Sequence, residues 1–233
     1  MPAIKIDLTL TFTTPPSVGA GGVSGTLADK VVTRNASDEF IIPASQLKGK
    51  LRHACEQLLR AQGVPLCRPP RGEQMCPQVS EDEDASKPIP RCAKGKYKSQ
   101  PRCLLCQIFG SPAYPSRLRF HDLIAVQANL PDETLRQMVS LNRRRRTAED
   151  KRLFTIETAP NFAGLQFRNS AAITGHLQPD EAKYLHLLLA GLKMLFAWGG
   201  SSSRGLGWAS EETHAWLDGV ETPLDIKEVK ACR

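Results

Sequence analysis

Five of the chain's seven cysteines are crowded between positions 67 and 106, and the last two form the motif CLLC. In a Cys-x2-Cys turn both thiolates reach the same metal ion, and a structural zinc site is closed by four such ligands. The surrounding stretch has little periodicity, and a segment of this length in a compact domain needs a staple of its own. The sequence therefore predicts a closed structural zinc site, with the expected ligands Cys76, Cys92, Cys103 and Cys106, and with Cys67 and His53 as substitutes.

Other interpretations of the cysteines fit less well. A zinc deaminase carries His-x-Glu and a Pro directly before its first Cys, but Glu56 lies three residues after His53, and Arg102 separates Pro101 from Cys103. A thioredoxin-like redox pair would lie at a strand–helix junction rather than in a cysteine-rich loop. The odd cysteine count argues against a disulfide framework. A set of unrelated thiols remains the alternative.

The charge balance indicates what the chain binds. Lys and Arg number 31 against 24 Asp and Glu, which gives a net charge of +7, so a polyanion such as nucleic acid is the favoured partner. The basic run NRRRR at 142–146 suits phosphate contacts, although such a run is by default a solvated face. Because only 6% of the residues are aromatic, contacts to a nucleic-acid backbone are expected rather than extensive base stacking.

Two further segments have residue types that suit phosphate groups. A predicted helix begins at Ser45, and its positive dipole end carries Lys48, Gly49 and Lys50, which suits a phosphate. Lys48 and Arg52 lie one turn apart on the same side, near the helix start. The glycine-rich run GGSSSRGLG at 199–207 is either a plain tight turn or a loop that presents backbone N–H groups to a polyanion. It lacks the Lys-Ser/Thr pair of a nucleotide P-loop, so NTP hydrolysis is not expected.

The elements that must position these side chains follow from hydrophobic periodicity. Residues 3–14 alternate as a half-buried strand, and Leu47, Leu51 and Leu59 recur at helical spacing after a Ser45 cap. The order strand, helix, strands, helix, strand is that of a ferredoxin-like or RRM-like α+β sandwich. The further expected elements are an extended segment at 39–43, a strand at 117–126, a short helix at 130–141, a hairpin over 153–168 that turns at 160–164, a helix at 178–198 with Phe196 on its core face and Gly199 and Gly200 at its end, and a final short strand.

No stretch of the sequence has the features of a membrane span or of a secretory signal. The longest apolar run, LHLLLAGLKMLFAW, is interrupted by His186 and Lys193 and is too short to cross a bilayer. The opening residues MPAIKIDLTL lack the charged-then-apolar layout of a signal peptide. A cytoplasmic location is therefore expected.

Taken together, these segments resemble the RAMP superfamily, the RNA-binding subunits of CRISPR effector complexes. IIPASQLKGKLRHACE resembles the family's helix start, CLLCQIFGS resembles its zinc knuckle, and RLRFHD resembles the strand that follows. NRRRRTAEDKRLFTIETAPNFAGLQF is similar to the arm of family members, and WGGSSSRGLGW is similar to their glycine-rich loop. Each motif alone is weak, but their order and distances make the resemblance fairly specific.

Within the superfamily the chain is most similar to the repeating backbone subunit of type III complexes. The resemblance implies one domain over residues 1–233, with a zinc-bound insertion at 64–117 and a β-hairpin thumb in the arm at 140–168. It implies as partners the CRISPR guide RNA, the target RNA and other effector subunits, including further RAMP proteins. The residues expected to bind RNA are Ser45, Lys48, Lys50, Arg52, Arg143, Arg144, Ser203 and Arg204.

The resemblance also implies a catalytic residue. Many backbone subunits cleave target RNA with one Asp after the first strand and with Mg²⁺ or another divalent metal, and Asp29 occupies the matching place in TLADKVVTRN. One carboxylate can suffice because RNA supplies its own 2′-OH nucleophile. Asp38 is the competing carboxylate and fits a turn better. The alternatives are a structural guide-binding subunit whose Asp is inert and an unrelated zinc-bearing RNA-binding protein.

Overall fold

The computed structural model describes residues 1–19, 28–68, 76, 103–112, 115–127, 130–162, 164–178, 181–230 and 232. The strands are β1 (Ala3–Phe12), β2 (Ile41–Ile42), β3 (Leu118–Phe120), β4 (Leu123–Ala125), β5 (Thr134–Asn142), β6 (Thr147–Thr158), β7 (Leu165–His176), β8 (Ala209–Leu217) and β9 (Val220–Glu221). The helices are α1 (Ala44–Ala61), α2 (Leu104–Phe109), α3 (Tyr184–Lys193) and α4 (Ile226–Lys230), with a 3-10 turn, η3, at Ser202–Arg204. Within these residues no helix is both long and apolar enough to span a membrane.

The main sheet has seven strands in the order β2-β4-β7-β1-β8-β9, with β3 also paired to β7. All of its ladders are antiparallel. With β3 and β4 taken as the second strand, β1, α1, β3/β4, β7, α3 and β8 follow one another in the βαββαβ order of a ferredoxin-like fold, and β1 lies between β7 and β8 as that fold requires. The predicted α+β, ferredoxin-like class is therefore confirmed.

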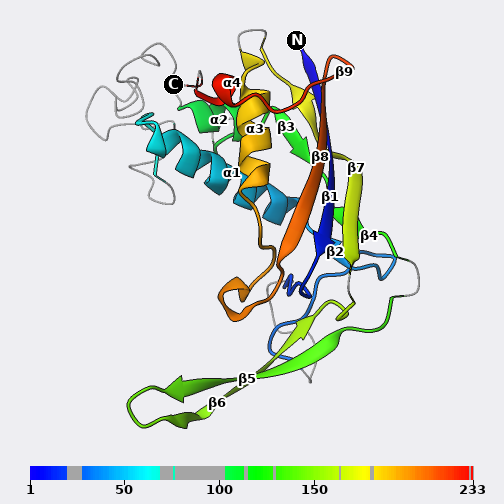
Figure 1. The fold of residues 1–233 in the computed structure, drawn as a ribbon, viewed down its shortest axis with the longest axis vertical. Coiled ribbons are helices and arrows are strands. Elements are labelled where there is room, and N and C mark those ends of the chain that lie inside the picture. Colours follow the sequence, from blue (N-terminus) through cyan, green and yellow to red (C-terminus); the bar gives the residue numbers. More distant parts are fainter. Residues whose placement is uncertain are drawn as a thin grey trace.

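The core lies between the sheet and two helices. The odd-even alternation of β1 buries Ile4, Ile6 and Leu8, together with Leu10 and Phe12, while the residues between them face the other side. Helices α1 and α3 pack on the buried face (Figure 1). At their crossing a Cβ on Gly191 of α3 would come within 2.9 Å of the Cys55 sulfur, so this close packing requires a residue without a side chain.

Helix α1 has the predicted apolar stripe but not the predicted cap. Leu47, Leu51 and Leu59 are buried as expected. The N-cap is Pro43 instead of Ser45, and the helix makes no side-chain cap bond of its own. The Ala44 N–H donates instead to a carboxylate oxygen of Asp122 at 2.7 Å. A residue from the loop between β3 and β4 thus satisfies one of the orphan donors at the helix start.

The second long helix is shorter than the sequence predicts. Helix α3 ends at Lys193, well before Gly199 and Gly200, and Phe196 is 61% exposed rather than on the core face. The helix ends early because the loop that follows it places the Trp198 side chain in the core. In this loop the backbone N–H of Trp198 donates to the Gly207 carbonyl. The single strand expected at 117–126 is also divided into β3 and β4.

The region from 130 to 168 differs most from the prediction. The expected helix at 130–141 is strand β5, and the expected hairpin over 153–168 does not form, because β6 pairs with β5 while β7 joins the main sheet. The turn of the hairpin is therefore Arg143–Arg146 and not 160–164. Tertiary pairing has overridden the helix-start pattern LPDE. Figure 1 shows β5 and β6 projecting beyond the end of the main sheet.

Candidate functional site

Four buried cysteines from separate parts of the chain meet in one cluster. The sulfurs of Cys67, Cys76, Cys103 and Cys106 all lie within 4.8 Å of one another. The Cys67 sulfur is 3.5 Å from that of Cys106 and 3.6 Å from that of Cys103, which is too far for a disulfide. Four thiolates around one ion at zinc–sulfur bond length would be about 3.8 Å apart. The cluster therefore has the composition and spacing of a closed, tetrahedral metal site.

Three of the four expected ligands, Cys76, Cys103 and Cys106, belong to this cluster. Cys67, a substitute in the sequence-based expectation, belongs to the cluster. Cys92 lies outside the described residues. His53, the other substitute, is exposed on α1 and hydrogen-bonds to Gln57, so it takes no part. Cys55 is buried under α3, where its sulfur contacts the Leu187 carbonyl.

Arg52 lies directly against this cluster. One guanidinium nitrogen donates to the Gly110 carbonyl at 2.9 Å and another contacts the Cys106 sulfur at 3.3 Å. Burial lowers the pKa of Arg52, but the charge and hydrogen bond of Cys106 outweigh it and the net shift is upward. A residue predicted to hold RNA therefore also ties α1 to the metal-binding segment.

The same arginine lines a cavity of about 350 Å³ between α1 and the segment after α2. Lys48 lies one turn before Arg52 on its wall, and burial followed by the charge of Arg52 lowers the pKa of Lys48. Ser111 and Ser116 line the opposite side, and the Ser111 hydroxyl oxygen is buried with no hydrogen-bond partner in the described structure. Two cations that repel each other beside an unsatisfied hydroxyl donor suit a bound oxyanion.

Burial also lowers the pKa of Lys50, the third predicted cation of this helix, while Ser45 is exposed at its start. Sequence reasoning missed Ser111 and Ser116. Ser111 could have been predicted, because it is the last residue of CLLCQIFGS and the chain that follows a metal knuckle must pass the adjoining helix.

Asp29 lies where the hairpin leaves the body of the molecule. Its N–H donates to the Thr155 carbonyl at 2.9 Å, and its carboxylate Oδ2 accepts the Thr155 N–H at 2.7 Å. The next residue, Lys30, forms a parallel bridge with Ile156 of β6. The carboxylate is thus fixed at one oxygen while the residue remains exposed to solvent.

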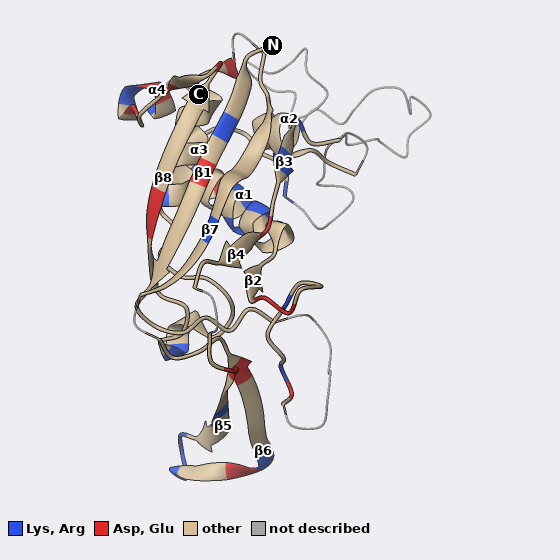
Figure 2. Cartoon of the chain, turned by 90° about the vertical axis from the view of Figure 1, so that its right-hand side faces the viewer, with Lys and Arg blue, Asp and Glu red and all other residues tan. Residues whose placement is uncertain are grey.

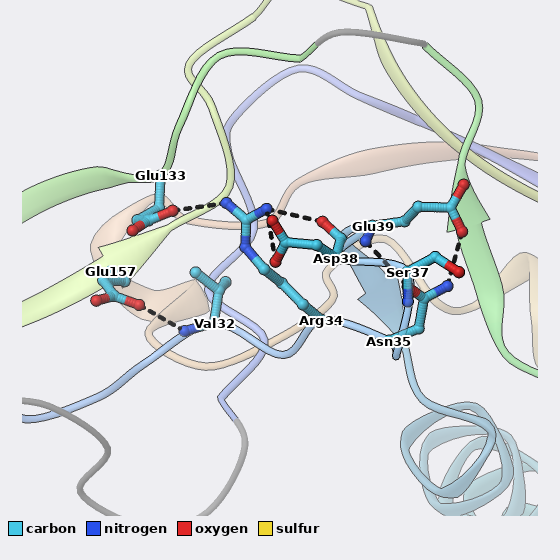
Figure 3. Close-up of polar contacts among 8 residues, drawn as sticks. All are labelled: Val32, Arg34, Asn35, Ser37, Asp38, Glu39, Glu133 and Glu157. Atoms are coloured by element: carbon cyan, nitrogen blue, oxygen red, sulfur yellow. Dashed lines mark hydrogen bonds and ion pairs between the residues drawn. The ribbon is translucent and has the colours of Figure 1, made fainter.

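The chain after Asp29 anchors both strands of the hairpin, as Figure 3 shows. The Val32 N–H donates at 3.0 Å to a carboxylate oxygen of Glu157, a residue of β6. Arg34 binds Glu133 at 2.6 Å, directly before β5, and also the Asp38 carbonyl at 2.8 Å. Asp38 has a φ of 62° in a tight turn and pairs with Arg34. The competing carboxylate is therefore a turn residue, as the sequence indicated.

The glycine-rich loop packs against the same end of the molecule. Gly199 and Gly207 both have positive φ, and a Cβ on Gly207 would lie 1.8 Å from the Trp198 carbonyl oxygen. The Gly200 N–H donates to the Ser17 carbonyl at 2.7 Å, and the Gly207 N–H donates to the Pro15 carbonyl. These N–H groups bind the loop after β1 rather than facing solvent, so the glycines serve close packing.

The loop also meets the hairpin. Arg204, at the end of η3, lies over the Phe154 ring of β6 at 5.5 Å and contacts the Met138 sulfur of β5 at 3.3 Å. Ser203 and Arg204 both remain exposed. Asp29, the glycine-rich loop and the hairpin base are thus brought together, whereas Ser45, Lys48, Lys50 and Arg52 form a separate group on α1.

The tip of the hairpin is a basic turn. Asn142 orders it, because its side-chain oxygen accepts the N–H groups of Arg144 at 3.0 Å and Arg145 at 2.9 Å. All four arginines of the turn, at positions 143–146, are exposed. Figure 2 shows basic residues at this tip, and it also shows acidic residues along β8.

Two comparisons with known proteins add to this geometry. A family model described as the RAMP superfamily matches residues 9–210. No curated protein matches the sequence significantly.

Proposed function

The chain belongs to the RAMP superfamily, whose members are CRISPR-associated RNA-binding proteins, and we propose that it is the repeating guide-RNA-binding subunit of a type III effector complex. We further propose that it cleaves target RNA with Asp29. The observation that carries this function is the position of Asp29, an exposed carboxylate fixed by Thr155 at the base of a projecting, arginine-tipped hairpin.

The α1 cavity supports guide binding. A guide backbone presents one phosphate per nucleotide, and Lys48, Arg52 and Ser111 would surround one phosphate with charged and neutral donors. Binding would relieve the repulsion between Lys48 and Arg52. The basic turn of the hairpin supplies a second set of cations, and Ser203 and Arg204 lie at the base of the same hairpin. The cluster of cysteines binds zinc in this proposal, and zinc holds the segment that forms the far wall of the cavity.

The chemistry assigned to Asp29 is a transesterification of the target strand. The 2′-oxygen attacks the adjacent phosphorus, the bond from phosphorus to the 5′-oxygen breaks, and a 2′,3′-cyclic phosphate and a 5′-hydroxyl end result. The proton of the 2′-OH passes to a base, and a proton is delivered to the leaving 5′-oxygen. The Asp29 carboxylate either accepts the first proton or orients a divalent ion, which would offset charge on the phosphate oxygens. Anchoring by Thr155 holds one carboxylate oxygen in place for this role.

Asp29→Asn tests the proposal without disturbing the anchor, since the amide oxygen of Asn can still accept the Thr155 N–H. The assembled effector with this variant is incubated with complementary RNA and Mg²⁺, and product lengths are resolved on a gel. We expect regularly spaced cuts to fall at least about 100-fold in rate while target binding is unchanged. The matched control is Asp38→Asn, which removes the competing carboxylate and leaves the cuts intact. An unchanged ladder for Asp29→Asn would show that the subunit binds RNA but is inert.

A further inference from the structure

Strand β8 has one edge that is paired and one that is largely open. On the inner side it pairs with β1 from Ala209 to Leu217. On the outer side β9 covers only Trp216 and Leu217. One backbone hydrogen bond lies at each end of the remaining outer edge. The Thr222 N–H donates to the Ala215 carbonyl at 2.8 Å, and the Ala209 N–H donates to the Phe196 carbonyl at 3.0 Å. Between them lies the β8 edge, Ser210–His214, with no ladder partner on its outer side in the described part of the chain.

The outward backbone groups of the β8 edge follow from those two bonds. Neighbouring residues of a strand direct their N–H and C=O groups to opposite edges, so residues two apart face the same edge. Because Ala209 and Ala215 bond outward, Glu211 and Thr213 also present their N–H and C=O groups outward. These four groups, over a stretch of about 17 Å, are a template for one more strand.

A cavity of about 380 Å³ adjoins this edge on its helix side. Leu189 of α3, Ala215, Pro223 and Leu224 are its apolar lining, and Lys193, Thr213, Thr222, His214 and Glu221 complete it. In an added strand, alternate side chains would point to this side of the sheet. Those side chains would therefore be apolar.

The other side of the edge is acidic. Glu212 and Glu221 are 74% and 60% exposed and flank His214, whose ring nitrogens lie 3.5 Å and 3.0 Å from them. Hydrogen bonds from the ring of His214 to the carboxylates of Glu221 and then Glu212 raise the pKa of His214, as expected in a locally negative field. Since the chain as a whole carries +7, this acidity is a local feature. The intervening side chains of an added strand would meet Glu212 and would therefore be basic.

We propose that the β8 edge binds an extended segment of a partner protein in which apolar and basic residues alternate, by addition of a strand to the main sheet. The apolar side chains enter the α3 cavity, the basic ones face Glu212, and the outward groups of Glu211 and Thr213 supply main-chain hydrogen bonds. RNA is not the expected occupant of this edge, because its carboxylates would repel phosphates.

A second copy of the chain fits the β8 edge poorly. Antiparallel self-pairing centred on this stretch would place Glu212 directly opposite Glu212 of the other copy, and like charges in that position are destabilising. An acidic edge of this kind opposes self-association and at the same time selects a basic strand.

The test uses the full isotope-labelled chain and a blocked five-residue peptide of alternating lysine and valine, followed by NMR and amide hydrogen exchange. We expect the peptide to shift the amide signals of Glu211 and Thr213 and to slow their exchange. Thr213→Pro removes one outward donor without breaking a bond to β1 and should weaken binding at least tenfold, whereas Thr213→Ala keeps the donor and should bind as the parent does. A peptide with glutamate in place of lysine should bind at least tenfold more weakly.

Three results would overturn the proposal. One is no binding of the lysine–valine peptide, or equal binding by Thr213→Pro. Another is a dimer in sedimentation that Thr213→Pro dissolves, since a second copy would then be the occupant. The third is that a short RNA shifts the same amide signals. None of these depends on whether Asp29 cleaves RNA, so this proposal and the proposed function fail separately.

Discussion

At the cysteine cluster four side chains are buried together, whereas Asp29, Ser203 and Arg204 near the hairpin base and the arginines of the turn at its tip are exposed to solvent. The buried group satisfies itself, because its sulfurs face one another and Arg52 covers one side. The exposed group is held by hydrogen bonds to Thr155 and from Arg34, and its side chains remain accessible to solvent. The difference agrees with the proposed function, in which the first region maintains the fold and the second contacts RNA.

The largest expected effect tests the buried region. Cys106→Ser removes one of four metal ligands, and we expect it to lower the free energy of unfolding by about 5 kcal/mol or more, since metal binding and folding are coupled. Urea unfolding and zinc content of the purified chain measure the two together. Cys55→Ser is the matched control, because Cys55 is equally buried but outside the cluster, and its zinc content should equal that of the parent. Full zinc in Cys106→Ser would contradict the assigned ligand set.

An intermediate loss of stability is expected in the glycine-rich loop, which packs tightly although it lies beside the exposed region. Gly207→Ala adds a Cβ that would lie 1.8 Å from the Trp198 carbonyl oxygen at a φ of +71°, so we expect a loss of about 3 kcal/mol. Gly205→Ala has a similar φ but open space around it and should lose only about 1 kcal/mol. Thermal unfolding of both variants compares them. Equal losses would mean that close packing against Trp198 is unimportant.

The smallest effect on stability is expected at the hairpin tip. Arg143 and Arg144 changed together to Ala should alter the free energy of unfolding by less than about 0.5 kcal/mol, because both side chains are exposed. Guide RNA binding should weaken, and the slope of log affinity against log salt should fall in magnitude by about 1.4, from two lost phosphate contacts.

Lys227 and Lys230 of α4, changed to Ala, remove the same charge away from the hairpin and serve as the control for the tip. If both pairs changed the slope equally, the hairpin would act only through net charge. The hairpin tip would then not be a specific RNA contact, and exposure alone would distinguish the two regions.

The sequence predicted the elements whose side chains alternate between core and solvent. Strand β1 and the buried stripe of α1 follow their periodicity, and so does the ferredoxin-like order. Strand β5 was mistaken for a helix because LPDE is a good helix start and because its apolar residues do not mark its more covered face: Leu135, Val139 and Leu141 are exposed. For the same reason, the hydrophobic pattern of the sequence did not indicate that β5 pairs with β6.

The kind of metal site was predictable, and three of the four preferred ligands belong to the observed cluster. Clustered cysteines and the CLLC turn pointed to a closed site, and the four sulfurs agree with it. The choice of Cys67 depends on where the end of α1 brings the following chain, which spacing alone does not give. The dual position of Arg52 was hidden for the same reason, because its neighbours Gly110 and Cys106 are distant in sequence.

Arg52 belongs at once to the wall of the anion cavity and to the surroundings of the Cys106 sulfur. The two sites therefore share a residue, and a shared residue makes their binding equilibria interdependent. By reciprocity, whatever factor metal occupancy contributes to anion affinity, the anion must return to metal affinity. Under the proposed function, a zinc ion that strengthens phosphate binding in the cavity would itself be bound more tightly when RNA is present, and one that weakens it would be bound less tightly.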